Sequence, residues 1–278
     1  MTATTVPLPA AGAGTAPAGG RTGAGRYALS DALTVTWRNL LAYVRLPQLL
    51  VFSTIQPVMF VLLFRYVFGG AFQSSVPGIP YVDYLMPGIF VQTTVFGAIA
   101  TAVGLATDLK SGLLERFRSL PMARSAVLAG RTFADLTRNV FVTALMATVG
   151  FAVGFRIHTG ALAFLAGLGL VLLFGYALSW VFATVGLAVG DPETAQAAAF
   201  PVMAPLVFAS TVFVPASSMP SWLQGFAEHQ PVSVTASAVR ALMIGGPTTS
   251  YVLQSLAWCV GILLVFGPIA VRRYRRTV

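Results

Sequence analysis

Charged side chains are scarce in this sequence. Only 9% of its 278 residues are charged, whereas 56% are apolar. A soluble globular chain usually carries about 25% charged residues, because its surface has to face water. The composition therefore argues against a soluble globule and predicts a membrane protein.

The residue types that build disulfides, metal sites and active sites are also rare. The one cysteine, Cys259, lies in an apolar segment, so no intramolecular disulfide can form. The two histidines, His158 and His229, are far apart and lack an acidic or thiol cluster, so we expect no metal site. Neither a G-x-S-x-G nor an H-E-x-x-H motif occurs, so no catalytic residue is expected.

The 17 basic residues give a net charge of +9, but they gather in a few clusters between apolar segments. Such clustering is typical of a topological signal in a membrane protein, and a nucleic-acid partner is not expected. If the amino terminus is cytoplasmic, all the basic residues except Arg65, Arg156 and Arg240 fall on the cytoplasmic side. The positive-inside rule therefore predicts that both termini are cytoplasmic.

Two regions precede the first long apolar run. Residues 1–27 are rich in Ala, Gly, Thr and Pro without hydrophobic periodicity, which predicts a disordered cytoplasmic tail. Residues 28–46 have apolar side chains at helical spacing, with Ser30 as a candidate N-cap and Pro47 as a break. We expect an amphipathic helix in the membrane interface, with Trp37 at headgroup depth.

Six apolar segments follow, each near the ~20 residues that cross a ~30 Å hydrocarbon layer. Backbone groups in lipid must be bonded internally, so the predicted fold class is an all-α membrane protein. It has a six-helix transmembrane domain over 47–271 and a basic tail over 272–278. Arg131, Asp135 and Arg138 are expected to project from the membrane, leaving only neutral polar groups deep in the spans. The predicted spans are 48–68, 84–106, 126–155, 161–189, 195–214 and 252–271.

The loop between the second and third spans is highly charged. Its sequence over 107–131 is TDLKSGLLERFRSLPMARSAVLAGR. Leu113 and Phe117 share one face of a short predicted helix that ends at Pro121, and Glu115, Arg116 and Arg118 share another. This pattern is typical of docking into a groove of a partner protein, and equally of a helix lying on anionic lipid.

The same region contains GLATDLKS, Gly104 to Ser111, which resembles a phosphate-binding loop but lacks its second glycine. Leu109 stands there, and the preceding residues form a predicted membrane helix instead of a strand. We therefore expect no nucleotide site in this chain.

A segment of mixed character, residues 214–247, lies between the fifth and sixth spans. Trp222 and Phe226 belong to a short apolar face, Pro231 breaks the chain, and a second apolar face follows. The pattern predicts two short helices that re-enter the outer leaflet, with a partly ordered surface loop as the alternative.

Polar and aromatic side chains on the first two spans are candidates to line a cavity for an amphipathic molecule. Alternatively, the polar ones only join helices and the aromatic ones face lipid. These residues are Gln56, Phe60, Phe64, Gln92, Thr93 and Phe96.

Taken together, the interfacial helix, the six spans, ERFRSLPMARS in the charged loop and MPSWLQGFAEHQPVSVTASAVRAL in the outer segment resemble the type-2 permease family of ATP-binding-cassette exporters. Within it, they are similar to the daunorubicin and doxorubicin resistance permeases of actinobacteria. Many members have Asn where this chain has Gln230.

The resemblance implies a permease dimer in the bacterial cytoplasmic membrane, bound to two ATPase subunits that hold ATP and Mg, and a hydrophobic drug, polyketide or lipid-like substrate. The helix around Phe117 would then be the coupling helix, with Leu113, Glu115, Arg116 and Arg118. The second inner loop, GDPETA (Gly190 to Ala195), would make a weaker contact with the ATPase. The outer gate would contain Trp222, Phe226 and Pro231.

Two other classes of function stay open at this point. A secondary transporter or channel would need no ATPase, and it predicts ionisable residues deep in the spans. A non-transporting interaction protein predicts no cavity.

Overall fold

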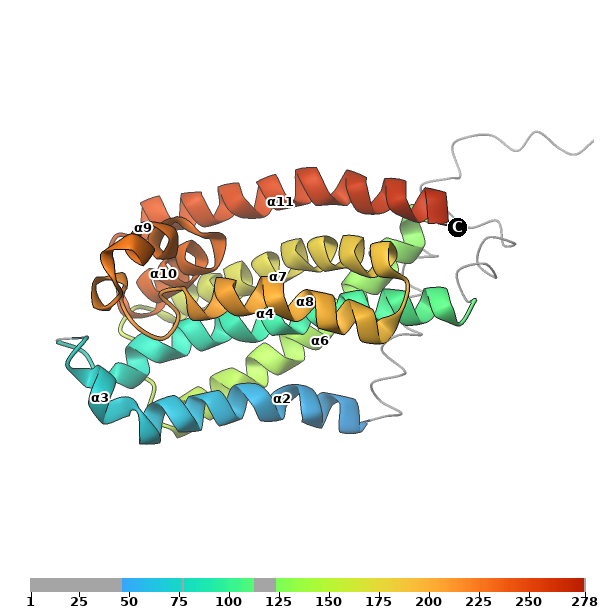
Figure 1. The fold of residues 1–278 in the computed structure, drawn as a ribbon. Coiled ribbons are helices and arrows are strands. Elements are labelled where there is room, and N and C mark those ends of the chain that lie inside the picture. The colour runs from blue at the N-terminus through green and yellow to red at the C-terminus, as the bar shows by residue number, and fades with distance from the viewer. Residues whose placement is uncertain (1–46, 77, 113–123, 278) are drawn as a thin grey trace, which may run out of the picture.

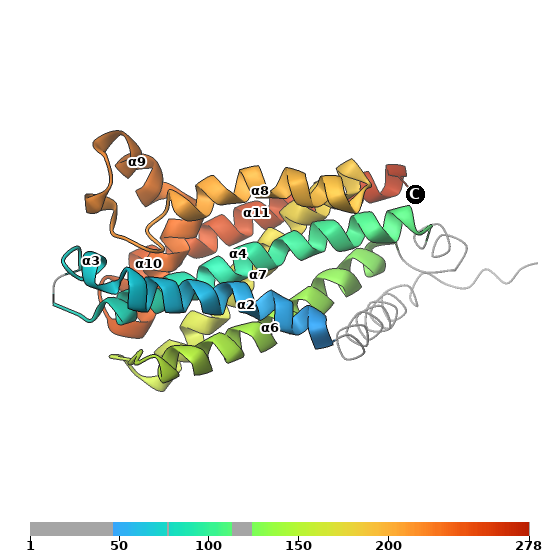
Figure 2. The ribbon, with the colours of Figure 1, turned by 60° about the horizontal axis from the view of Figure 1, so that its bottom comes forward.

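The chain folds into a bundle of long helices that run side by side (Figures 1 and 2). This computed structural model describes residues 47–76, 78–112 and 124–277, and every regular element in those ranges is a helix. The elements are α2 (Pro47–Leu62), the π-helical turn η1 (Leu63–Val67), α3 (Gly69–Gln73), α4 (Tyr81–Lys110), α6 (Arg124–Ala152), α7 (Ala161–Val189), α8 (Pro192–Phe208), the 3-10 turn η2 (Ala216–Ser218), α9 (Ser221–His229), α10 (Pro231–Ile244) and α11 (Thr248–Thr277).

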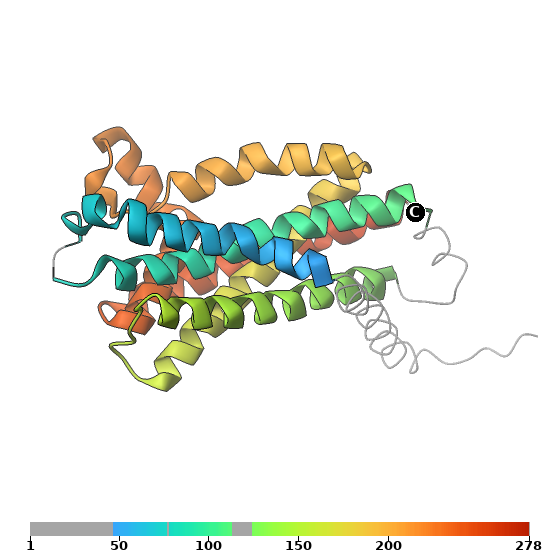
Figure 3. The same cartoon turned by 90° about the horizontal axis from the view of Figure 1, so that it is seen from below.

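The two ends of the bundle differ. The short helices α3, α9 and α10 gather at one end, which we call the cap end (Figures 1 and 3). The carboxyl end of α4, the start of α8 and the basic end of α11 lie at the other, which we call the tail end. Within the described ranges, the chain therefore crosses the length of the bundle once with each of six long helical segments.

Each of the six predicted spans is mainly helical, and α7 has the predicted bounds. Among the described residues, three helices are apolar and long enough to cross a membrane: Tyr81–Lys110, Ala161–Val189 and Thr248–Arg276. The six-span arrangement itself stays a prediction. The tail over 1–27, the interfacial helix over 28–46 and the charged helix around Phe117 lie outside the described residues.

The fifth predicted span, 195–214, is wrong at its end, because α8 stops at Phe208. Pro201 and Pro205 remove backbone donors from this helix. The carbonyls that follow are satisfied from other elements: Gln230 Nε2 donates to the carbonyls of Leu206 at 2.8 Å and Ala209 at 3.1 Å. Side chains from α4 complete the turn, with Tyr81 and Tyr84 hydroxyls donating to backbone oxygens at 2.9 and 3.0 Å.

The centre of the bundle is the contact between α4 and α7, where the two backbones approach closely. A Cβ on Gly186 would lie 2.4 Å from the carbonyl oxygen of Ala102. Only glycine fits there, as is common where membrane helices pack tightly. Phe90, Phe174 and Phe182 are among the large side chains fully buried in this core.

Residues 214–247 form the two predicted short helices, with the break directly before Pro231. The second, α10, is buried against α4, α7 and α11, and Thr235 and Ser255 share a hydrogen bond of 2.9 Å. The first, α9, is largely exposed. Re-entry into a membrane leaflet stays a prediction.

Candidate functional site

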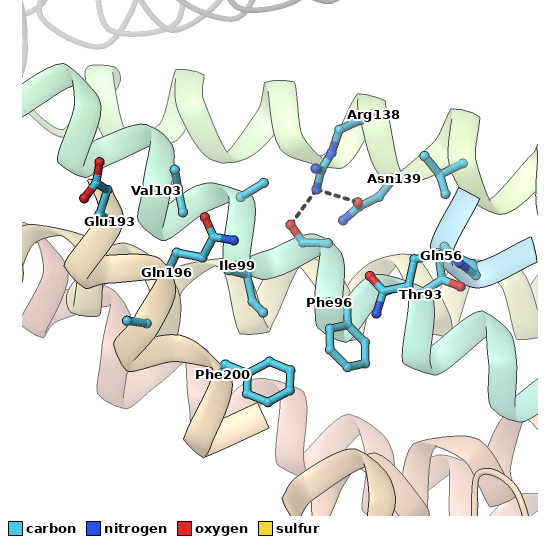
Figure 4. Close-up of a pocket in the computed structure, with 15 residues that line it drawn as sticks. Gln56, Thr93, Phe96, Ile99, Val103, Arg138, Asn139, Glu193, Gln196 and Phe200 are labelled. Carbon is cyan, nitrogen blue, oxygen red and sulfur yellow. Dashed lines mark hydrogen bonds between the residues drawn. The ribbon is translucent and has the colours of Figure 1, made fainter. Parts of the chain in front are cut away.

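A cavity of about 1070 Å³ opens between α2, α4, α6 and α8 (Figure 4). Ligand cavities commonly measure about 300–1,000 Å³ and combine apolar walls with a few polar groups. This one follows that pattern. Its lining residues are Gln56, Pro57, Thr93, Phe96, Gly97, Ile99, Ala100, Val103, Arg138, Asn139, Val142, Glu193, Gln196, Ala197 and Phe200.

The lining residues fix where the cavity lies along the bundle. Gly97 and Arg138 are close to the middles of α4 and α6. Glu193 is in the first turn of α8, which begins at the tail end. The cavity therefore extends from the middle of the bundle toward the tail end.

Of the six side chains proposed from the sequence, Gln56, Thr93 and Phe96 line this cavity. Phe60 and Phe64 do not; they belong to an aromatic cluster nearer the cap end, in which Phe64 stacks on Phe213 with ring centroids 4.3 Å apart. Gln92 is buried in the bundle, and its Oε1 accepts no hydrogen bond from the described residues.

Arg138 is the most unusual group in the wall, because its side chain is only 6% exposed. Its Nη2 donates to the carbonyl of Gly97 at 2.6 Å and to Oδ1 of Asn139 at 3.1 Å. Its Nε is buried and has no hydrogen-bond partner among the described residues. Within the same residues no carboxylate lies within ion-pair distance of this guanidinium.

A second buried polar group lies one turn away on α6. Asp135 is 1% exposed and accepts a hydrogen bond of 2.6 Å from the hydroxyl of Thr101. Arg131 approaches it at 3.9 Å and pairs with Asp108 at 3.3 Å. A Cβ on Gly104 would lie 1.5 Å from Arg131 Nη2, so this glycine of α4 makes room for the guanidinium.

Within the bundle, Asp135 and Arg138 are packed against α4. Their projection from the membrane stays a prediction. The polar groups buried in the bundle are not all neutral, which corrects the expectation drawn from the sequence. The reason is that α6 places its polar residues on one side, where carbonyls and hydroxyls of α4 satisfy them.

At the tail end, an exposed ion pair joins two chain segments. Lys110 Nζ lies 2.7 Å from Asp191 Oδ1. Asp191 is the N-cap of α8, where its Oδ2 accepts hydrogen bonds from the backbone N–H and the hydroxyl of Thr194, both 3.0 Å long. The hydrogen bond from Lys110, followed by those from Thr194, lowers the pKa of the Asp191 carboxyl to about 2.

The sequence GLATDLKS is helical up to Lys110. Its backbone N–H groups are used inside α4 and cannot wrap a phosphate. The coupling residues proposed from the sequence, Leu113, Glu115, Arg116, Phe117 and Arg118, lie outside the described residues.

At the cap end, charged and aromatic groups join α4 to other elements. The Arg240 guanidinium stacks 3.7 Å from the centroid of Tyr84 and donates to the carbonyls of Tyr84 and Thr211 at 3.1 and 3.0 Å. Asp83 is buried, and it contacts His158 Nε2 at 2.8 Å and accepts from the backbone N–H of Arg156 at 2.9 Å.

The proposed gate residues lie in this same region. Trp222 and Phe226 are exposed on α9, at 78% and 48%, and Pro231 begins α10. None of the three is among the residues that line the cavity.

Sequence reasoning missed much of the cavity wall on α6 and α8: Arg138, Asn139, Glu193, Gln196 and Phe200. One signal was available for α6. Its polar residues Arg131, Asp135 and Arg138 recur at intervals of three or four, which places them on one helix face. A polar face on a long apolar helix indicates an inward orientation.

Comparison with known proteins agrees with this architecture. Residues 31–244 match the ABC-2 type transporter family. The chain is 36% identical over 250 residues to the daunorubicin resistance ABC transporter permease protein DrrB1 of Streptomyces coeruleorubidus, covering 89% of this chain and 87% of that protein.

Two further relatives extend the comparison. The probable doxorubicin resistance ABC transporter permease protein DrrC of Mycobacterium tuberculosis is 29% identical over 258 residues, 92% of each chain. The putative transport permease ycf38 of Cyanophora paradoxa is 24% identical over 220 residues, 78% of this chain and 75% of that protein. The chain belongs to the ABC-2 type transporter family.

Proposed function

We propose that this chain is the permease subunit of an ATP-driven exporter that moves an amphipathic, hydrophobic compound out of the cytoplasm or inner leaflet. The observation that carries this proposal is the cavity of about 1070 Å³, with its apolar walls and few polar groups, in a chain of the ABC-2 type transporter family. A drug, a polyketide or a lipid-like metabolite has the matching chemistry.

The names of the relatives support a drug or a drug-like metabolite as cargo. DrrB1 is named for resistance to daunorubicin and DrrC for resistance to doxorubicin. Identity of 36% to DrrB1 over most of the chain supports a cargo related to that of DrrB1, and the residues of the cavity wall set the details of its recognition.

The energy would come from a separate enzyme. We propose that two copies of an ABC ATPase, which bind ATP and Mg, dock on the tail end through the helix that contains Leu113, Glu115, Arg116, Phe117 and Arg118. The Lys110–Asp191 pair supports this placement, since it joins two chain segments at the tail end and Lys110 stands three residues before Leu113 in the sequence. A ligand shifts an equilibrium only by its preference between two states, so the ATPase must contact this helix differently before and after closure.

A second copy of the permease would complete the pathway. Exposed apolar side chains on α2 and α8, among them Met59 and Val202, offer a face for a partner or for lipid. In this proposal all six long segments span a bacterial cytoplasmic membrane with both termini inside, and Trp222, Phe226 and Pro231 belong to the outer gate.

The direct test is export from cells or inverted vesicles that contain the permease and its ATPase. Replacing both Leu113 and Phe117 by Asp should abolish ATP-dependent transport and stimulated ATPase activity, because two buried carboxylates would oppose docking. The matched control replaces exposed Trp258 of α11 by Phe, which leaves the docking helix unchanged. Normal transport by the double variant, at normal membrane levels, would refute the docking proposal.

One observation favours a second candidate, a secondary transporter or channel. Such proteins keep ionisable residues deep in their spans, and Asp135 and Arg138 are buried near the middle of α6. Family membership favours the ATP-driven mechanism. Transport that survives without the ATPase and collapses on dissipation of the proton gradient would establish the second candidate instead.

A further inference from the structure

The buried guanidinium of Arg138 calls for a functional explanation. A cation inside a membrane bundle is costly unless a partner compensates it, and such residues usually face a polar pathway or a ligand. Asp135, one turn away, is bonded to Thr101 and approached by Arg131. The described residues leave Arg138 with neutral acceptors only, the Gly97 carbonyl and the Asn139 amide oxygen.

The geometry of these two contacts leaves part of the guanidinium available. Both use Nη2, which is thereby fixed between α4 and α6. Among the described residues, neither Nε nor Nη1 has a hydrogen-bond partner, and the side chain lines the cavity (Figure 4). Asn139 and Gly97 are therefore positioning residues, which hold the cation at the cavity wall without neutralising it.

The rest of the wall near Arg138 offers little charge compensation. Gln56, Thr93 and Gln196 are neutral, and Glu193 belongs to the first turn of α8 at the tail end. Phe96 and Phe200 provide aromatic surface beside this polar region (Figure 4). A guanidinium is a cation with N–H donors and no acceptor, so the group that gains most from it is an anionic oxygen.

We propose that Arg138 is a specificity-determining subsite for an anionic oxygen, such as a carboxylate, sulfonate or phosphate, on an amphipathic ligand whose apolar part lies against Phe96 and Phe200. The inference rests on the proposed function, because it assigns a ligand class to the same cavity. The anionic group has two possible sources, a free amphipathic compound or a lipid headgroup, and both present the same chemistry to Arg138.

Binding of a matched pair of probes tests the subsite. The purified full-length permease in phosphatidylcholine nanodiscs is titrated with 1-pyrenebutyrate and with 1-pyrenebutanol, and binding is measured by fluorescence against empty nanodiscs. A hydrogen bond to a charged group predicts that the carboxylate binds about 10 to 100 times more tightly than the alcohol. In Arg138→Gln the two affinities should become equal while the alcohol still binds as in the wild type.

Two further variants separate charge from folding. Arg138→Lys keeps the cation and should keep a preference for the carboxylate, and Arg275→Gln removes an exposed basic residue of the tail end and should change nothing. The subsite is refuted if the wild type shows no preference, if Arg138→Gln retains it, or if both probes lose affinity equally in that variant.

The same binding measurement in the presence of an anionic lipid identifies the source of the anion. In nanodiscs that contain phosphatidylglycerol, selective weakening of 1-pyrenebutyrate binding in the wild type supports a lipid headgroup at the subsite, and unchanged binding supports a free compound. These measurements need no ATPase, so the subsite can fail while ATP-dependent export still stands, and export can fail while the preference persists.

Discussion

Helix α4 packs against α7 on one side and against α6 on another, and the two contacts are built differently. Against α7 the backbones approach closely at Gly186 and the contact is apolar. Against α6 the contact contains an ion pair, a bonded carboxylate and a fixed guanidinium, at Arg131, Asp135 and Arg138.

The difference shows how one helix can serve two purposes. Lipid gives little hydrophobic drive for helix association, so a permanent contact relies on close packing. Polar groups in a bundle cost free energy unless satisfied, and they are found where a pathway or ligand needs them. The α4–α7 contact is therefore the closely packed part of the bundle, and the α4–α6 contact borders the cavity.

The largest expected loss of stability follows from substitution of Asp135. Replacing it by Leu leaves Arg131 without this carboxylate and the Thr101 hydroxyl without its acceptor, and breaking a buried charged contact costs about 3–5 kcal/mol. Asp135→Asn is the matched control, since it keeps an acceptor for Thr101 and should cost less. Denaturant unfolding of the purified protein in detergent measures both, and equal stability of wild type and Asp135→Leu would refute the role of the buried carboxylate.

A smaller loss of stability is expected at the close contact between α4 and α7. A Cβ on Gly186 would meet the Ala102 carbonyl, which is backbone and cannot turn aside, and overpacking of this kind costs about 1–3 kcal/mol. Gly169→Ala, on the same helix, is the control, because nothing lies within 4 Å of its added Cβ. Thermal unfolding should show a lower midpoint for Gly186→Ala only; similar midpoints for both variants would contradict the close approach of α4 and α7.

The smallest effect on stability is expected at the exposed Lys110–Asp191 pair, and this effect should depend on pH. The pKa of Asp191 is lowered from its ordinary value of 3.8 to about 2, so its contribution to stability is complete above pH 3.8 and disappears as the pH falls through about 2. Asp191→Asn keeps an N-cap and loses the charge.

The midpoint difference between wild type and Asp191→Asn should stay constant from pH 7 to about 4 and shrink below it. Glu228→Gln removes an exposed carboxylate on α9 at the cap end, away from the Lys110–Asp191 pair, so it serves as the control. A difference that grows toward low pH would show that the pKa of Asp191 is raised and not lowered.

Hydrophobic length predicted the helices well, and it predicted α7 to the residue. It failed where side chains from distant parts of the sequence decide where a helix ends. The end of α8 depends on Gln230, Tyr81 and Tyr84, which lie elsewhere in the fold and donate hydrogen bonds to backbone carbonyls at this turn. A local pattern carries no information on such distant partners.

The same limit applies to the cavity. Gln56, Thr93 and Phe96 could be proposed because polar and aromatic residues on apolar helices are conspicuous. Glu193 and Phe200 could not, since nothing in the sequence places α8 beside α2 and α4.

The sequence alone determined that this protein is a helical membrane chain, and it predicted that most basic residues lie on one side, because both inferences follow from composition, segment length and charge distribution. Only the tertiary structure decided which polar residues face inward and which helices enclose the cavity. The burial of Asp135 and Arg138 depends on acceptors and donors that α4 presents across the bundle, and that complementarity exists only once the helices have packed.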